Sequence, residues 1–228
     1  MTAVDTERSR VAPAGEASFR YGVVLAIVTA FMVLEVLSPD EDWSRAAGIA
    51  LAGAALSVAV GTSRERAEVR RARTLIVGVI ALVLVIAIWA GLLSDALTFV
   101  VGTVIVAAIP LALGGGLIRL INNEGVTVQA VAGALAIYLL IGMLFASAIG
   151  FVTAVDTSPY FTQGSHVDNG DVVYYSFTVM TTTGFGDFTA AQPIGHALAV
   201  LEMLTGQLYL VTVIGILIGN FVGRRLRK

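Results

Sequence analysis

The sequence predicts an all-α membrane protein with six transmembrane helices and one short re-entrant helix. Hydrophobic residues make up 57% of the 228 residues and charged residues only 13%, whereas soluble domains carry roughly 25% charged residues. Six apolar stretches approach the length of about 20 residues that a helix needs to cross a bilayer. With these six spans, the positive charges fall almost entirely on one side of the membrane.

Short segments containing polar residues, glycine or proline separate the predicted spans. The spans are residues 20–37, 45–61, 74–93, 96–118, 126–152 and 194–222. The second span is rich in alanine, glycine and serine, which favours close packing against neighbouring helices. Residues 1–19 have no apolar face and are predicted to be a disordered tail.

The distribution of charge predicts the orientation. With six spans both termini lie on one side, and every lysine and arginine except Arg45 falls on that side. The positive-inside rule makes it the cytoplasmic side, so residues 153–193 lie outside or re-enter the membrane. All basic residues except Lys228 are arginines, a bias of GC-rich bacterial genomes, so we expect a bacterial plasma membrane.

A basic link, residues 62–73, joins the second and third spans on the cytoplasmic side. We expect it to anchor the chain and to contact anionic lipid headgroups, rather than to form a dedicated ligand site. The arginines concerned are Arg64, Arg66, Arg70, Arg71 and Arg73.

The composition argues against an enzyme. The absence of cysteine excludes disulfides, thiolate metal sites and cysteine nucleophiles. The two histidines, His166 and His196, both fall on the outer side, and no span contains a metal-ligand or nucleophile–base spacing. We therefore expect no catalysis and no nucleic-acid partner. His166 could sense pH because an ordinary histidine has a pKa of about 6.5, but a single loop histidine is more often passive.

Between the last two spans, residues 171–187 read DVVYYSFTVMTTTGFGD. The first part is long enough for a short helix, which Asp168 or Asp171 could cap. Non-helical backbone at membrane depth is tolerated only inside protein or along a water-filled cavity. A re-entrant helix followed by a glycine-containing strand fits such a place.

The glycines indicate what this strand can do. A dehydrated cation needs oxygen atoms in place of its water, and a strand can aim all its carbonyls one way if its dihedrals alternate between right- and left-handed regions. Glycine enters the left-handed region at little cost, which accounts for Gly184 and Gly186. One strand forms only one side of a ring, so several chains must meet on an axis.

The stretch YYSFTVMTTTGFGD resembles the pore helix and signature filter of the potassium channel superfamily, whose usual filter is T-V-G-Y-G-D after a T-x-T run. Downstream, LEMLTGQLYLVTVIGILIGNFVG resembles the inner helices of bacterial two-span channels. The resemblance covers about residues 130–223 and is loose before residue 125. It implies a tetrameric pore-loop channel with K+ as its permeant ion and no further cofactor.

The resemblance also implies roles for individual residues. The carbonyls of Thr182, Thr183, Gly184 and Phe185, with the Thr182 hydroxyl, would bind K+; Gly186 completes the selectivity-filter loop and Asp187 stands at its outer mouth. Thr183 replaces the usual valine, so that a hydroxyl faces the space behind the filter. Phe185 replaces the usual tyrosine and leaves no phenol to fasten the filter.

Other positions support this filter. Tyr174 and Tyr175 stand where many members carry two tryptophans, and we expect Tyr175 to hydrogen-bond Asp187 and partly hold a loose filter. Thr178 stands where some members carry a carboxylate; a satisfied buried hydroxyl is favoured there over a gating role. Glu202 lies within a span, and hydrogen bonding behind the pore helix is favoured over direct ion contact.

The glycines of the last span have two interpretations each. Gly206 follows Gly186 at the spacing of the family's gating-hinge glycine, so a hinge is favoured over close packing at this position. For Gly215 and Gly219, close packing is favoured over a hinge. Glu35 lies near the outer end of the first span and is expected to reach the membrane interface.

The fourth span lacks the features of a voltage sensor. A voltage-sensing helix carries arginines at every third residue, because each charge that moves across 100 mV contributes ~2.3 kcal/mol to gating. Residues 96–118 contain no arginine, and Arg119 stands alone at the cytoplasmic end. Steep voltage gating by this route is not expected. Because only a short tail follows Gly223, regulation is expected from lipid, tension, pH, the filter or another subunit.

The predicted organisation is a tail (1–19), a four-span peripheral domain (20–125), a pore domain (126–223) and a basic tail (224–228). A potassium-selective homotetramer is the favoured function. A poorly selective monovalent cation channel and a non-conducting scaffold or sensor subunit remain as alternatives.

Overall fold

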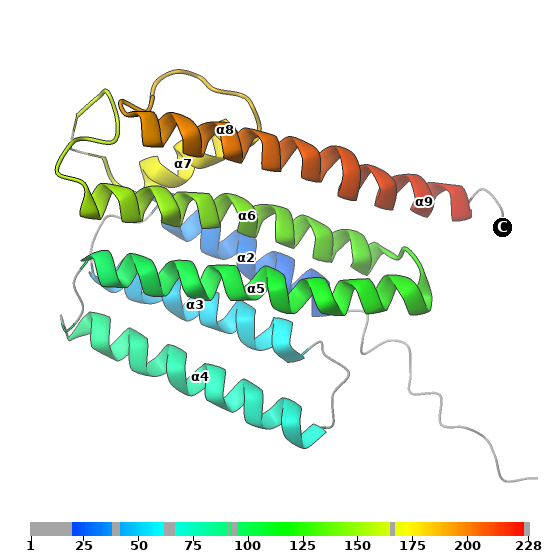
Figure 1. Cartoon of the computed structure of the whole chain (residues 1–228). Coiled ribbons are helices and arrows are strands. Elements are labelled where there is room, and N and C mark those ends of the chain that lie inside the picture. Colours follow the sequence, from blue (N-terminus) through cyan, green and yellow to red (C-terminus); the bar gives the residue numbers. More distant parts are fainter. Residues whose placement is uncertain are drawn as a thin grey trace, which may run out of the picture.

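The computed structural model describes residues 20–37, 42–61, 67–90, 92, 95–164 and 167–225. Long helices lying side by side make up most of this part of the chain (Figure 1). They are α2 (Arg20–Leu37), α3 (Asp42–Gly61), α4 (Ala67–Trp89), α5 (Asp95–Glu124), α6 (Val128–Val155), α7 (Asn169–Met180), α8 (Pro193–Leu208), the π-helix η1 (Tyr209–Ile214) and α9 (Gly215–Arg225).

Each predicted span overlaps a helix, although the third predicted span, 74–93, extends past the end of α4 and the fifth, 126–152, begins two residues before α6. Three stretches within the described residues are long and apolar enough to cross a membrane, namely Val100–Asn122, Val128–Val155 and Pro193–Asn220. The other three predicted spans coincide with shorter apolar helical stretches, Tyr21–Leu37, Ala46–Ala59 and Gly78–Ala87. The membrane character is therefore confirmed by length and composition, and the six-span count stays a prediction.

Several predictions fall outside the described residues. These concern the tail 1–19, Arg64, Arg66, His166 and residues 226–228. Arg70, Arg71 and Arg73 lie on α4, so the end of the basic link is helical, but their side chains are not described.

A tight turn joins α5 to α6. Gly125 adopts a φ of 73°, which suits glycine, and its N–H donates to Ile121 O over 2.8 Å. Thr127 then caps α6, because its hydroxyl accepts a 3.2 Å hydrogen bond from the Ala130 N–H. The two long helices therefore run antiparallel and pack closely.

α2 lies at the centre of the helix bundle. It packs against α3 on one side and against α6 and α7 on the other, and its Gly22 N–H donates to Gln129 Oε1 of α6 over 3.1 Å. The main core joins it to α5 and α6 through fully buried side chains: Val24, Val28, Ile109, Leu113, Leu140 and Ile149. α4 packs chiefly on α3, at the edge of Figure 1 farthest from α8.

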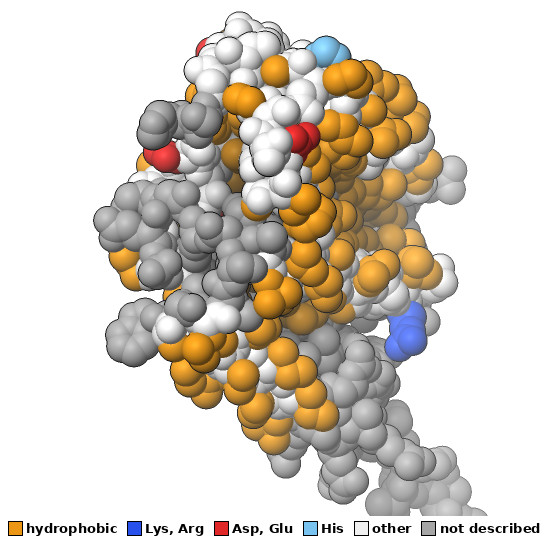
Figure 2. All heavy atoms as spheres, turned by 60° about the vertical axis from the view of Figure 1, so that its left-hand side comes forward, with side chains coloured by type: hydrophobic (Ala, Val, Ile, Leu, Met, Phe, Trp, Pro, Cys, Tyr) orange, Lys and Arg blue, Asp and Glu red, His pale blue; other side chains and the backbone are white. Residues whose placement is uncertain are grey.

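Hydrophobic side chains cover much of the visible surface, as Figure 2 shows. On α4, Leu75, Val79 and Val83 are each more than half exposed. A water-soluble protein would carry charge on such a face, whereas a lipid-facing helix exposes apolar side chains.

A second hydrophobic cluster joins α5 and α6 to the last helix. Its buried members are Leu117, Ala130, Ala134, Ile214 and Leu217. The end of α5 thus shares a cluster, through α6, with the distal half of the continuous helix formed by α8, η1 and α9, which we call the inner helix.

Candidate functional site

The re-entrant helix predicted from the sequence is α7. It packs between α6 and α8, and Asp171 Oδ2 accepts a 3.2 Å hydrogen bond from the N–H of Asp168, the N-cap residue. Glycine permits two of its contacts: a Cβ on Gly142 would lie 2.8 Å from Phe177 Cζ, and a Cβ on Gly170 would lie 2.7 Å from Val36 O. α7 is therefore closely fitted to α6 and to the end of α2.

α7 ends in a Schellman motif. Thr182 N donates to Val179 O over 2.9 Å, and Thr183 N donates to Thr178 O over 2.8 Å. The residue in the left-handed region at this position is usually glycine, but here it is Thr182, with a φ of 58°. A β-branched residue in this region is strained.

The segment after α7, residues 181–187, is called the glycine loop below. Gly184 and Gly186 have φ values of 47° and 82°, so both glycines are in the left-handed region, as predicted. Together with Thr182, every second residue has positive φ, whereas Thr183 and Phe185 do not. This alternation is the one that lets successive carbonyls point to the same side.

Threonine hydroxyls connect the glycine loop to its surroundings. Thr183 and Thr181 share a hydrogen bond of 2.9 Å between their hydroxyls, and Thr181 donates back to Phe177 O of α7 over 2.7 Å. Thr178 donates to Tyr175 O over 2.8 Å, so its hydroxyl is satisfied. The Thr183 hydroxyl is therefore turned towards α7.

Asp187 is bound by Tyr174 rather than by Tyr175. The Tyr174 hydroxyl donates to Asp187 Oδ2 over 2.8 Å, so the prediction that Tyr175 makes this bond is wrong. One helical step turns Tyr175 away: it is 4% exposed and packs edge-on against Phe161, with ring centroids 5.0 Å apart. Tyr174 also stacks on Phe185, with centroids 6.4 Å apart and planes 3° apart.

The hydrogen bond to Asp187 also affects the ionisation of Tyr174. Because the Asp187 carboxylate accepts a hydrogen bond from the protonated phenol, it raises the pKa of Tyr174 above its ordinary value of 10.0. The phenol therefore keeps the proton that makes this bond at neutral pH.

The outer end of the glycine loop is tied to the segment after α6. Thr162 N donates to Thr189 O over 2.9 Å, the two threonine hydroxyls lie 2.6 Å apart, and Phe161 forms an isolated antiparallel bridge with Ala190. Both ends of the loop are thus fixed to neighbouring structure.

Glu202 and Gly206 of α8 both face α7. Glu202 is 0% exposed and hydrogen-bonds Ser176 of α7, which agrees with the favoured interpretation of this residue. A Cβ on Gly206 would lie 2.5 Å from both Met180 O and Met180 Cγ. Gly206 is therefore a close-packing position, and its role as a hinge stays a prediction.

Gly215 and Gly219 show less packing within the chain. A Cβ on Gly215 would meet only Leu210 O, at 3.7 Å, and one on Gly219 would meet no atom within 4 Å.

Two features of the inner helix were not predicted. The first is the π-helix Tyr209–Ile214, where the Tyr209 hydroxyl donates to Ala134 O of α6 over 2.8 Å. The second is Gln207, whose amide nitrogen lies 3.5 Å from the Thr182 hydroxyl. No residue pattern in this apolar segment distinguishes a π-helix from an α-helix. For Gln207, the only feature of the sequence that could have indicated a contact with the glycine loop is a polar side chain within an apolar span.

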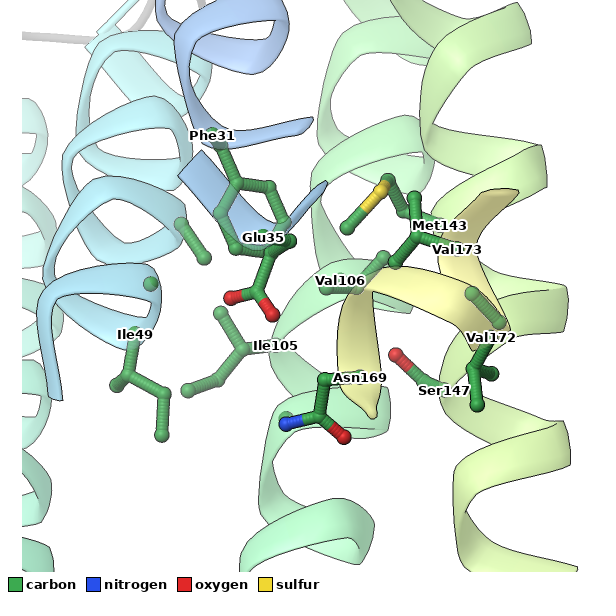
Figure 3. A pocket seen from close by; sticks show the side chains of 14 residues that line it. Phe31, Glu35, Ile49, Ile105, Val106, Met143, Ser147, Asn169, Val172 and Val173 are labelled. Atoms are coloured by element: carbon green, nitrogen blue, oxygen red, sulfur yellow. The ribbon is translucent and has the colours of Figure 1, made fainter. Parts of the chain in front are cut away.

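A cavity of about 90 Å³ lies at the start of α7, between α2, α3, α5 and α6 (Figure 3). Its walls are mostly apolar, and its polar side chains are Glu35, Ser147 and Asn169. Glu35 is half-buried and lies against Gly48 of α3, and the expectation that it reaches the membrane interface stays a prediction. Helices α2, α3, α5 and α6 therefore meet at the start of α7.

Residues 134–222 match a family model described as ion channel. The match includes most of α6, all of α7, the glycine loop and nearly all of the inner helix. No curated protein and no solved structure matches the chain.

Proposed function

We propose that this chain, whose residues 134–222 match a family model described as ion channel, is a potassium-selective channel that works as a homotetramer in a bacterial plasma membrane. The family match supports ion-channel function, and the resemblance to the potassium channel superfamily agrees with it. The potassium selectivity, the tetramer and the compartment are our proposal.

The alternation of positive φ at Thr182, Gly184 and Gly186 carries this proposal. Rings of backbone carbonyls that replace the hydration shell of K+ require this backbone. The carbonyls of Thr182, Thr183, Gly184 and Phe185 would form the cages, with the Thr182 hydroxyl at the inner end. No reaction is catalysed, and the ion gradient supplies the energy.

Exposed apolar side chains on the inner helix support assembly with other copies. Leu204, Leu208 and Val211 are 56%, 62% and 71% exposed and follow one another at spacings of four and three residues, as in helices that pack along a seam. The same spacing places Leu201, Ile218 and Val222 on this stripe. We propose that neighbouring copies cover part of it and that the rest faces lipid.

Acidic side chains lie at the proposed outer mouth. Asp156, Asp168 and Asp187 are exposed, and acidic side chains are visible in the upper part of Figure 2. We propose that this face attracts cations. The termini and the basic link lie in the cytoplasm in this arrangement, where Arg64, Arg66, Arg70, Arg71 and Arg73 meet anionic lipid.

Gating by steep voltage dependence is not part of the proposal. α5 carries one basic residue, Arg119, near its cytoplasmic end, and each charge that crosses 100 mV contributes only ~2.3 kcal/mol.

Flux through the purified chain in liposomes tests the proposal. We expect K+ flux well above Na+ flux, blocked by Ba2+ and abolished by Gly184→Ala. Gly164→Ala is the matched control, because Gly164 also has positive φ and open space around its Cα but lies in the outer segment. Equal K+ and Na+ flux would favour a poorly selective cation channel, and no flux in either gradient would favour a scaffold or sensor subunit.

A further inference from the structure

Three helices meet at one buried hydroxyl. Ser176 of α7 is 0% exposed, and its Oγ lies 2.8 Å from Gly142 O of α6. The same Oγ hydrogen-bonds Glu202 Oε1 of α8. The hydroxyl thus joins the re-entrant helix to both long helices that flank it.

The number of available protons restricts the state of Glu202. A serine hydroxyl carries one proton, and a carbonyl oxygen can only accept. If the Ser176 hydroxyl donated its proton to a Glu202 carboxylate, the lone pairs of Ser176 Oγ would face the carbonyl oxygen of Gly142 at 2.8 Å, and two acceptors would repel each other. Both contacts are satisfied only when Glu202 is protonated and donates to Ser176, which in turn donates to Gly142 O.

The surroundings favour the same state. Glu202 Oε2 is buried and has no hydrogen-bond partner among the described residues, which costs much more for a carboxylate than for a neutral acid. Residues 126–223 contain no lysine or arginine, so neither this pore region nor that of a second copy provides a cation. A buried carboxylate normally requires such a partner.

The other titratable groups nearby cannot replace a cation. Tyr160 and Tyr175 interact electrostatically with Glu202, but their hydroxyls are uncharged at neutral pH. The remaining ones on α6, α7 and α8 are Tyr138, Asp171, Tyr174 and His196. His196 is turned to the other end of α8, where its Nε2 lies 2.9 Å from Ala190 O.

We propose that Glu202 is a protonated acid that positions α7, and thereby the glycine loop, by donating a hydrogen bond to Ser176. The connection to the loop is short: Thr178, two residues after Ser176, has a carbonyl that accepts from the N–H groups of both Thr183 and Gly184. A displacement of α7 would therefore move the loop. This role in ion selectivity rests on the proposed function.

Infrared spectroscopy of the full chain in lipid at neutral pH tests the protonation. We expect a carbonyl band of a protonated carboxylic acid that shifts in D2O, is absent in Glu202→Gln, and is displaced in Ser176→Ala because the acid loses its acceptor. A difference between wild type and Glu202→Gln that contains only carboxylate bands would overturn the proposal.

Flux measurements on the same variants test the positioning role. Glu202→Gln keeps a donor to Ser176 and should retain the K+/Na+ flux ratio, whereas Glu202→Met is isosteric without a donor and should lose it. A selective Glu202→Met channel would contradict positioning. Because the infrared band does not depend on flux, a chain that fails to conduct but shows the band refutes the proposed function alone.

Discussion

Tyr174 and Asp187 are joined by a 2.8 Å hydrogen bond across the glycine loop. Since Thr178 of the same helix accepts from Thr183 and Gly184, α7 fastens the loop at both ends. Tyr174→Phe should keep the hydrogen bonds to Thr178 O and remove the one to Asp187. We expect faster loss of flux during sustained conduction and a lower K+/Na+ flux ratio. Tyr175→Phe is the control, since Tyr175 has no bond to Asp187. Equal effects of the two variants would contradict this assignment.

The same contact predicts a dependence on alkaline pH. The bond to Asp187 raises the pKa of Tyr174 above 10.0, so its stabilising effect is present below pH 10 and is lost as the pH rises through the raised value. Wild-type selectivity should decline over this alkaline range. Tyr174→Phe should start lower and lack this transition, which ion flux measured across a pH series would reveal.

Gly206→Ala should destabilise the protein because its Cβ would meet the Met180 carbonyl at 2.5 Å. Overpacking of this kind costs about 1–3 kcal/mol, so the thermal midpoint of the purified assembly should fall. Gly219→Ala, which meets no atom within 4 Å, is the matched control. If Gly206→Ala changed the open probability without lowering the midpoint, the glycine would act as a hinge instead.

Thr182→Gly should stabilise the fold and impair the proposed function. Relief of a left-handed non-glycine residue is worth about 1–2 kcal/mol, but the hydroxyl at the inner end of the loop is lost. Thr183→Gly has no positive φ to relieve and should not stabilise. Thermal unfolding and K+ flux together check both parts, and a destabilised Thr182→Gly would show that strain at this position is unimportant.

Gly170→Ala tests whether α2 supports α7. The added Cβ would lie 2.7 Å from Val36 O, a backbone atom that cannot rotate away. We expect a lower thermal midpoint and reduced K+ selectivity, compared with Gly102→Ala, whose site has no atom within 4 Å. Unchanged flux in Gly170→Ala would show that the contact between α2 and α7 does not affect the loop.

The sequence predicted the helices well because hydrophobic stretches determine where helices in a membrane can lie. The first span, 20–37, has the bounds of α2, and the last, 194–222, lies within the inner helix. The backbone of Gly184 and Gly186 was also predicted, since glycine marks positive φ.

The partners of individual side chains could not be predicted. Tyr174 and Tyr175 are identical neighbours, and only the rotation of α7 decides which one faces Asp187. Thr182 has positive φ without being glycine, so composition contained no signal for it. Ser176 is an ordinary helix residue until α6 and α8 surround it.

The position of α2 has a consequence for biosynthesis. Gly22 bonds Gln129, 107 residues later in the chain, and Val36 contacts Gly170, which is synthesised later still. The surface that receives the re-entrant helix therefore enters the membrane long before that helix leaves the ribosome. Until then, lipid, water or insertion machinery must contact Gly22 and the end of α2 in place of their final neighbours. The glycine loop can take its final structure only after α7 and the inner helix that packs on it have been translated.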